Sequence, residues 1–301
     1  MFVQGSITAL ATPFTARGID EQAFADFVEW QIGQGTKGLV VCGTTGEGPT
    51  LTMAERRRLT QICVESASRR VPVIVGTGTN CTATTIEQTR AAKADGADAA
   101  LIVTPYYNKP TQEGLFRHFA TVADAVDLPI VLYNVPSRTG VDLQIGTVEQ
   151  LAGIPSIIGI KDATGDLDRP SATALAAGRR FLQLSGDDPS AVSFNFAGGR
   201  GCISVVANVA PALCDELQQA CRLKNWGLAR SLQNRLEPLL MALSREPNPG
   251  PIKHALSLVR PGFDRHPRLP LVGVSASTAL DIKAALTNLD LCSSISCNRA
   301  A

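Results

Sequence analysis

The sequence has no excess of charge of either sign. Its 301 residues include 28 Lys and Arg against 27 Asp and Glu, which gives a formal net charge of +1. A chain without a basic or acidic surplus has no general electrostatic attraction for nucleic acid or for an anionic membrane surface. We therefore expect neither as a partner.

Long hydrophobic runs are also missing. The apolar stretches have the length of strands, and none approaches the roughly 20 residues that span a bilayer. The first residues, 1–10, lack a basic region followed by a sustained apolar stretch, so we expect no signal peptide. These absences predict a cytoplasmic protein without a membrane span.

Several chemical motifs are absent as well. The eight cysteines contain no Cys-x-x-Cys pair, and scattered thiols in a large chain predict free cysteines rather than disulfides. There is no dinucleotide fingerprint, P-loop, H-E-x-x-H or G-x-S-x-G. The three histidines, His118, His254 and His266, fall outside any ligand spacing. We expect neither a metal centre nor a serine hydrolase.

What is present is a repeat of short apolar, β-branched runs with amphipathic segments between them, such as 52–68, 83–94 and 112–125. Such a repeat is typical of strand–helix units. Eight units predict a closed (β/α)8 TIM barrel. A doubly wound sheet usually carries a glycine fingerprint after its first strand, and the sequence here is Ala11-Thr12-Pro13-Phe14. The expected strands are 4–10, 38–42, 71–75, 99–104, 129–134, 156–161, 181–185 and 201–206.

After about residue 225 the strand pattern stops. The segments 225–244, 253–259 and 278–288 read as helices joined by proline-rich connections. We therefore predict a catalytic barrel over residues 1–224 and a helical extension over 225–301. The last residues, 292–301, are expected to form a frayed tail.

Lys161 closes the strand-like run 156–162, where burial would disfavour a cationic side chain. A neutral amine is a nucleophile that condenses with a carbonyl carbon. A solvated pair of Lys161 with Asp162 at the strand end is an equally good interpretation of these residues alone. The residues at the other predicted strand ends favour the nucleophile.

In a (β/α)8 barrel, the active site lies at the carboxyl ends of the strands. The turn at 43–46 offers backbone N–H groups and hydroxyls to a carboxylate, Arg138 offers a bidentate clamp, and Tyr133 offers a proton shuttle. Taken singly, these would be an ordinary loop, a solvated arginine and a core tyrosine. All three tyrosines of the chain lie at these ends. Together with Lys161 they indicate carbon–carbon bond chemistry on a keto acid.

Three motifs carry a family resemblance, in this order along the chain: Gly43-Thr44-Thr45-Gly46-Glu47, Tyr133-Asn134-Val135-Pro136-x-Arg138-Thr139, and Gly159-Ile160-Lys161-Asp162-Ala163. They resemble the dihydrodipicolinate synthase branch of the pyruvate-dependent class I aldolases. The similarity runs from about residue 2 to about 290 and includes Asn248-Pro249-x-Pro251-x-Lys253. It implies a homotetramer of barrels with C-terminal helices.

The resemblance also implies roles for four catalytic residues. Lys161 would form a Schiff base with pyruvate, and Tyr133 would donate and accept protons. Thr44 and Tyr107 would complete a proton relay, with Tyr107 reaching across a dimer interface into the neighbouring site.

Four further residues would bind substrate. Thr45 would hold the pyruvate carboxylate, and the main chain at Ile203 would face the same pocket. Arg138 would bind the carboxylate of aspartate semialdehyde, and Gly186 would shape the pocket floor. The implied product is 4-hydroxy-tetrahydrodipicolinate, formed without a metal or diffusible cofactor in lysine and diaminopimelate biosynthesis.

Two alternatives remain open. A sister aldolase, of the N-acetylneuraminate lyase or sugar-acid type, would typically lack the arginine at position 138, and the lyase has Ser at the position of Thr45. A non-catalytic keto-acid-binding protein would need Lys161 or Tyr133 to be idle.

One departure from the family concerns feedback by lysine. Inhibited members have a histidine at the position of Arg56 and a glutamate at that of Thr84. We therefore expect weak or absent inhibition. Of the other positions of that site, Asn80 and Tyr106 match, whereas Gly48, Pro49 and Met53 differ.

Overall fold

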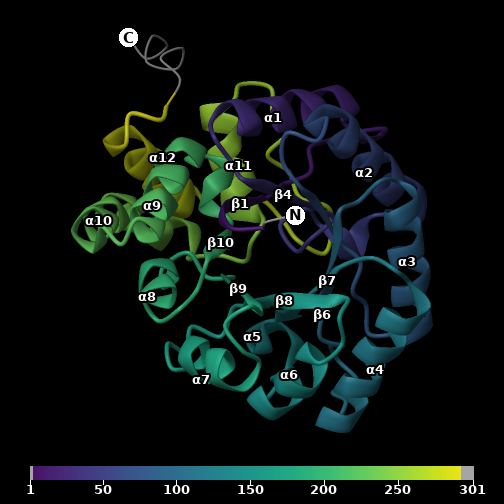
Figure 1. The fold of residues 1–301 in the computed structure, drawn as a ribbon. Helices are drawn as coiled ribbons and strands as arrows, with labels where there is room; N and C mark the ends of the chain where they lie inside the picture. The colour runs from purple at the N-terminus through teal and green to yellow at the C-terminus, as the bar shows by residue number, and fades with distance from the viewer. Residues whose placement is uncertain (1–2, 293–301) are drawn as a thin grey trace, which may run out of the picture.

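The computed structural model describes residues 3–292. Within them, eight parallel strands close into a barrel in the order β1-β10-β9-β8-β7-β6-β5-β4, which confirms the predicted TIM barrel. Figure 1 shows the helices around these strands. The strands are β1 (Gly5–Ala9), β4 (Gly38–Val41), β5 (Val73–Gly76), β6 (Ala99–Val103), β7 (Ile130–Asn134), β8 (Ile157–Asp162), β9 (Leu182–Ser185) and β10 (Gly201–Ser204).

The barrel interior is filled by apolar side chains that alternate along the strands. Ile7, Val40, Val131, Leu184 and Ile203 belong to one buried cluster. Parallel strands in a barrel are covered on both faces, so their sequences read as continuous apolar runs rather than as alternating ones. This is why the strand positions were visible in the sequence.

An outer ring of helices covers the strands. The predicted segments 52–68, 83–94 and 112–125 correspond to α2, α3 and α4, with ends that differ by at most one residue. A capping box in which Thr52 and Glu55 bond each other's backbone begins α2. The ring consists of α1 (Glu21–Gly33), α2 (Met53–Ala67), α3 (Thr82–Ala94), α4 (Gln112–Ala125), α6 (Ile145–Ala152), α7 (Arg169–Ala176), α8 (Ala191–Phe196) and α9 (Pro211–Arg222).

Short elements were not predicted. A hairpin of β2 (Phe14–Thr15) and β3 (Gly18–Ile19) follows β1, and the four-residue helix α5 (Pro136–Thr139) follows β7. Two 3₁₀ turns, η1 (Gly48–Thr50) and η2 (Val206–Asn208), follow β4 and β10. Segments this short carry no periodic hydrophobic pattern, so sequence reasoning does not detect them.

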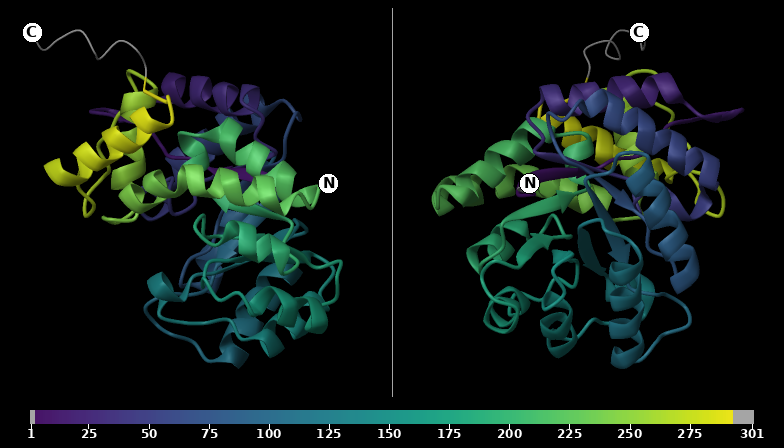
Figure 2. Two further views of the ribbon diagram at one scale, coloured as in Figure 1. Left: turned by 90° about the vertical axis from the view of Figure 1, so that its left-hand side faces the viewer. Right: turned by 45° about the vertical axis from the view of Figure 1, so that its right-hand side comes forward.

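The C-terminal segment forms α10 (Trp226–Leu243), α11 (Gly250–Val259) and α12 (Ala276–Asn288), close to the predicted ranges. These helices, green to yellow in Figure 2, pack against one another, and α10 also packs on α9. Phe27 of α1 meets Phe263 at 5.2 Å between ring centroids, and Leu236 shares their hydrophobic cluster. The boundary between residues 224 and 225 stays a prediction. The predicted frayed tail, apart from Cys292, lies outside the described residues.

Residues 3–292 bear on three expectations drawn from the sequence, which concern membrane spans, disulfides and metal centres. No helix within residues 3–292 is long and apolar enough to cross a bilayer. The cysteines of that range are all free, as the sequence predicted for them. Among the same residues, no group of three or more His, Cys, Asp or Glu is placed to hold a metal ion.

Candidate active site

A cavity of about 190 Å³ opens at the carboxyl ends of the barrel strands. Six of the eight predicted site residues line it: Thr44, Thr45, Tyr133, Arg138, Lys161 and Gly186. The remaining two, Tyr107 and Ile203, do not. The closure of the barrel therefore brings together residues that lie more than a hundred positions apart in the chain.

Lys161 and Tyr133 face each other across neighbouring strands. They are directly paired in the β7–β8 ladder, and the Nζ atom of Lys161 lies 4.2 Å from the centre of the Tyr133 ring. Both side chains are buried, with 5% and 7% of their surface exposed. The buried amine thus lies beside a phenol, which suits imine formation with proton transfer.

Asp162 does not form the surface pair with Lys161 that the sequence left open. Its carboxylate accepts a hydrogen bond from Nε of Arg169 at 2.8 Å, and that guanidinium also bonds Asp142 at 3.1 Å. Asn134, at the end of β7, donates to Asp142 at 2.8 Å. This network ties the ends of β7 and β8 together from the side away from the cavity, and it leaves Lys161 without a carboxylate partner in the described residues.

The loop after β4 is built to present backbone N–H groups. Glu47 has a positive φ of 57°, and a Cβ at Gly48 would lie 2.4 Å from the carbonyl oxygen of Cys42, so the tight turn requires glycine there. Within residues 3–292, the N–H groups of Thr44 and Thr45 form no hydrogen bond. Successive free N–H groups of this kind are suited to an anion; that they bind a carboxylate stays a prediction.

Three contacts that hold this loop were not predicted. The side-chain amide of Asn248 donates to Oγ1 of Thr45 at 3.0 Å. Glu47 forms an ion pair with Nζ of Lys253 at 2.9 Å, and its other oxygen accepts from the backbone N–H of Arg268 at 2.7 Å. Burial lowers the pKa of Lys253, and the charge of Glu47 opposes this. The C-terminal helices therefore fix the loop that carries Thr44 and Thr45.

The sequence contained a signal for the ion pair. Lys253 stands in the apolar run Pro251-Ile252-Lys253-His254-Ala255, and a buried lysine needs a partner. The partner lies 206 positions earlier, which no local pattern specifies.

Arg138 and Gly186 lie at the rim and wall of the cavity. Arg138 is carried by α5, is exposed, and has no ion-pair partner in the described part of the chain. Its charge is thus available to a second anionic group. A Cβ at Gly186 would lie 2.8 Å from Cε of Lys161, so glycine leaves the room that the lysine side chain occupies.

Tyr107 and Ile203 have other surroundings. Tyr107 is 88% exposed and has a positive φ of 71°, which is uncommon for a bulky residue. Between residues 3 and 292, no hydrogen bond links Tyr107, Thr44 and Tyr133, so the relay stays a prediction. Ile203 is fully buried in β10, and Val205 is the nearby residue that lines the cavity.

Comparisons with known proteins agree with this geometry. The family model described as "Dihydrodipicolinate synthetase family" matches residues 2–289. The 4-hydroxy-tetrahydrodipicolinate synthase of Rhodospirillum centenum is 52% identical over 288 residues, which cover 96% of this chain and 99% of the relative.

Solved structures give the same result. Dihydrodipicolinate synthase from Aquifex aeolicus superposes with a TM-score of 0.94 at 40% identity, over 96% of this chain and 99% of that one. The chloride-inhibited dihydrodipicolinate synthase from Acinetobacter baumannii, solved with pyruvate, gives 0.93 at 44% identity, over 96% and 100%. With its barrel, its cavity and these similarities over nearly the whole length, the chain belongs to the dihydrodipicolinate synthetase family.

Proposed function

We propose that this protein is a 4-hydroxy-tetrahydrodipicolinate synthase, which condenses pyruvate with L-aspartate 4-semialdehyde in the first committed step of lysine and diaminopimelate biosynthesis. The observation that carries the proposal is the buried amine of Lys161, 4.2 Å from the ring centre of Tyr133, in a cavity at the strand ends. The names of the most similar relatives support the same reaction.

The first half of the reaction makes a carbon nucleophile. The amine of Lys161 adds to the keto carbon of pyruvate, and loss of water gives an imine. The imine nitrogen draws electrons from the neighbouring methyl group, which loses a proton and leaves an enamine. Tyr133 is the acid and base within reach of these atoms.

The second half forms and releases the product. The enamine carbon attacks the aldehyde carbon of aspartate semialdehyde, and the new alkoxide takes a proton. The substrate's amino group then adds to the imine carbon and displaces the nitrogen of Lys161. The result is the cyclic product and the free amine of Lys161.

Two anion sites determine the choice of substrates. The free N–H groups of Thr44 and Thr45 bind the pyruvate carboxylate in this proposal, and Asn248 holds Thr45 in place. The exposed guanidinium of Arg138 binds the carboxylate of the aldehyde. This second site favours aspartate semialdehyde over the uncharged aldehydes of the sister aldolases, because a bidentate arginine pair needs a carboxylate.

The proposed assembly is a homotetramer in the cytoplasm. The exposure and the positive φ of Tyr107 fit a side chain that enters a neighbouring subunit's site, since strained backbone is often found at functional positions. Free cysteines through the described range are typical of a reducing compartment. Sedimentation of the wild type and of Tyr107→Phe, together with their turnover, tests this role.

Feedback by lysine is proposed to be weak or absent. The guanidinium of Arg56 is nine-tenths buried and donates to the carbonyl oxygens of Gly48 and Gly76, both at 2.8 Å. The guanidinium is therefore occupied by backbone carbonyl groups, one in the loop after β4 and one at the end of β5. Thr84 offers no carboxylate for the ammonium groups of a lysine ligand.

The test of the proposed function is a coupled assay. Pyruvate and aspartate semialdehyde are supplied with dihydrodipicolinate reductase, and the consumption of NADPH is followed for the wild type, Lys161→Ala and Lys283→Ala. We expect turnover in the wild type and in the exposed-lysine control Lys283→Ala, and none in Lys161→Ala. A wild type that forms an imine with pyruvate but turns over only another aldehyde would be a sister aldolase. A chain that binds pyruvate equally well without Lys161 would be a binding protein.

A further inference from the structure

A cavity of about 830 Å³ lies away from the catalytic one. Its wall includes residues just before β1, β9 and β10, so it opens near the amino ends of the strands, whereas the catalytic cavity opens at the carboxyl ends. The helices α7, α8 and α9, the loops that follow them and Trp226 at the start of α10 supply the rest. Sites for small molecules generally have about 300–1,000 Å³, and this pocket falls in that range.

The rim of this pocket is positively charged. Arg179, Arg200, Arg222 and Lys224 line it, and no Asp or Glu does. Within residues 3–292 none of these four cations forms an ion pair, although many other arginines of the chain do. The whole chain has a net charge of only +1. The local surplus is therefore a property of this pocket and not of a generally basic surface.

Helix ends explain only part of this arrangement. Arg222 and Lys224 lie at the carboxyl end of α9, where cations are favourable beside the helix dipole. Arg179 and Arg200 lie farther beyond a helix end, in the segments before β9 and β10. Arg200 donates to the carbonyl oxygen of Arg179 at 2.6 Å, which holds its guanidinium at the rim.

The floor of the pocket is polar, and its hydrogen-bonding capacity is incompletely used. Asn195 donates to Oε1 of Gln218 at 2.8 Å, and Gln183 donates to the carbonyl oxygen of Pro170 at 3.0 Å. In the described part of the chain, Nε2 of Gln218 and Oε1 of Gln183 form no hydrogen bond. Both side chains are at most 5% exposed. The two atoms are not among the buried polar atoms that lack a partner, so they are open to the pocket and available to a ligand there.

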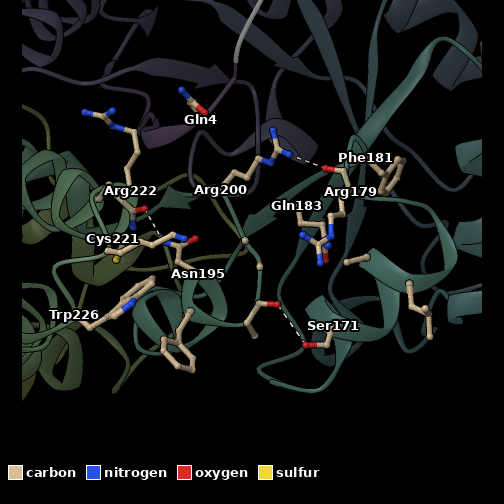
Figure 3. A pocket seen from close by; sticks show the side chains of 18 residues that line it. Gln4, Ser171, Arg179, Phe181, Gln183, Asn195, Arg200, Cys221, Arg222 and Trp226 are labelled. Carbon is tan, nitrogen blue, oxygen red and sulfur yellow. Dashed lines mark hydrogen bonds between the residues drawn. The ribbon is translucent and has the colours of Figure 1, made fainter.

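One wall is aromatic. The rings of Phe196 and Trp226 meet edge to face at 5.1 Å between centroids, and both line the pocket. In Figure 3 the side chains of Arg222, Gln4 and Arg200 lie along the upper side of the pocket, above Asn195 and Trp226. A ligand could thus place charged groups among the arginines and a flat ring against the aromatic wall.

We propose that this pocket binds a small organic molecule that carries at least two negative charges next to a planar ring. The arginines recognise its oxyanions, because guanidinium groups pair with phosphate and carboxylate in a bidentate way. The aromatic wall and the free amide atoms of the floor recognise its ring. Nucleoside phosphates and aromatic polycarboxylates share this chemistry. The site is separate from the catalytic cavity and from the proposed reaction.

The two tryptophans of the chain allow a direct test. Trp30 stacks on Phe27 in α1 and does not line the pocket, so Trp30→Phe leaves Trp226 as the only tryptophan. The fluorescence of Trp226 is followed in this variant as ADP, trimesate (a benzene ring with carboxylates), adenosine or pyrophosphate is added. Adenosine lacks the charges and pyrophosphate lacks the ring. Saturating pyruvate is present in a parallel series, so that binding in the catalytic cavity is detected.

We expect ADP or trimesate to give a saturable change that pyruvate does not displace, and adenosine and pyrophosphate to bind at least about tenfold more weakly. Whichever of ADP and trimesate binds more tightly identifies the oxyanion. Arg200→Ala and Arg222→Ala should each weaken binding by about tenfold or more, because each removes a charged hydrogen-bond donor. The control Arg230→Ala, an exposed arginine of α10 outside the pocket, should change binding by less than about twofold.

Three results would overturn the proposal. The first is no saturable change with ADP or trimesate at millimolar concentration. The second is binding that pyruvate displaces or that Arg200→Ala and Arg222→Ala leave unchanged. The third concerns the assembly: if Phe196→Ser reduces the size of the particle in sedimentation and no probe binds either form, the pocket wall is a contact between copies of the chain.

Discussion

The buried ion pair of Glu47 and Lys253 is predicted to connect the stability of the C-terminal helices with pyruvate binding. The perturbation is Lys253→Met, which keeps the length of the side chain and removes its charge. It leaves the carboxylate of Glu47 buried, with the N–H of Arg268 at 2.7 Å as its remaining partner.

The magnitude follows from burial. The side chains of Lys253 and Glu47 are 0% and 1% exposed, and removal of one partner from a buried pair costs about 3–5 kcal/mol of the free energy of unfolding. For a chain of 301 residues, that cost lowers Tm by roughly 5–8 °C. The double variant Glu47→Gln/Lys253→Met has no uncompensated charge, so it should regain at least about 2 kcal/mol.

The assay combines denaturation with kinetics. Because Glu47 fixes the loop of Thr44 and Thr45, kcat/KM for pyruvate should fall by about tenfold or more in Lys253→Met. The matched control is Lys93→Met, which breaks the exposed pair with Asp127 at 3.3 Å and should cost less than about 1 kcal/mol. A loss of unfolding free energy in Lys253→Met as small as that in Lys93→Met would contradict the prediction. So would a double variant whose loss equals the sum of the losses of its two single variants.

Three further predictions concern single side chains. Gly186→Ala should lower the yield of the imine with Lys161 by about tenfold or more, because its Cβ would lie 2.8 Å from both Cε of the lysine and Cβ of Ala163, and this crowding should also cost about 1–3 kcal/mol of stability; an unchanged yield contradicts the packing argument. Burial lowers the pKa of His118 to about 4 from 6.5, so the unfolded chain binds a proton that the folded one does not, and about 3 kcal/mol of stability should be lost as pH falls from about 6.5 to 4. His118→Gln should lack this part of the pH dependence in thermal unfolding, and identical pH profiles for the two proteins would oppose it. Lysine should not half-inhibit the enzyme below about millimolar concentration in the coupled assay, because the guanidinium of Arg56 is bonded to backbone carbonyl groups and Thr84 has no carboxylate. Half-inhibition at a lower lysine concentration would refute this.

The fold was predictable because each strand is a local feature. The run 156–161 predicted the strand found at Ile157–Asp162, since a strand covered on both faces is apolar along its whole length. The hairpin Phe14–Thr15 and Gly18–Ile19 was missed, because two-residue strands have no period to detect.

The candidate site was predictable only for residues at the carboxyl ends of the barrel strands, where active sites of this fold lie. Residues at strand ends, such as Lys161 and Tyr133, converge because the strands are parallel and closed. The contacts of Asn248 with Thr45 and of Lys253 with Glu47 join residues 203 and 206 positions apart. They depend on how the C-terminal helices pack on the barrel, which no local pattern encodes. The role proposed for Tyr107 involves a second subunit, and residue patterns within one chain do not place a side chain relative to another chain.

The central claim is that Lys161 forms an imine with pyruvate, and borohydride trapping tests it most directly. The protein is incubated with pyruvate, reduced with borohydride and digested, and the peptides are examined by mass spectrometry. We expect one pyruvate-derived adduct, located on Lys161 and absent from Lys161→Ala. An adduct on another lysine such as Lys109 or Lys253, or turnover without any trapped adduct, would contradict it.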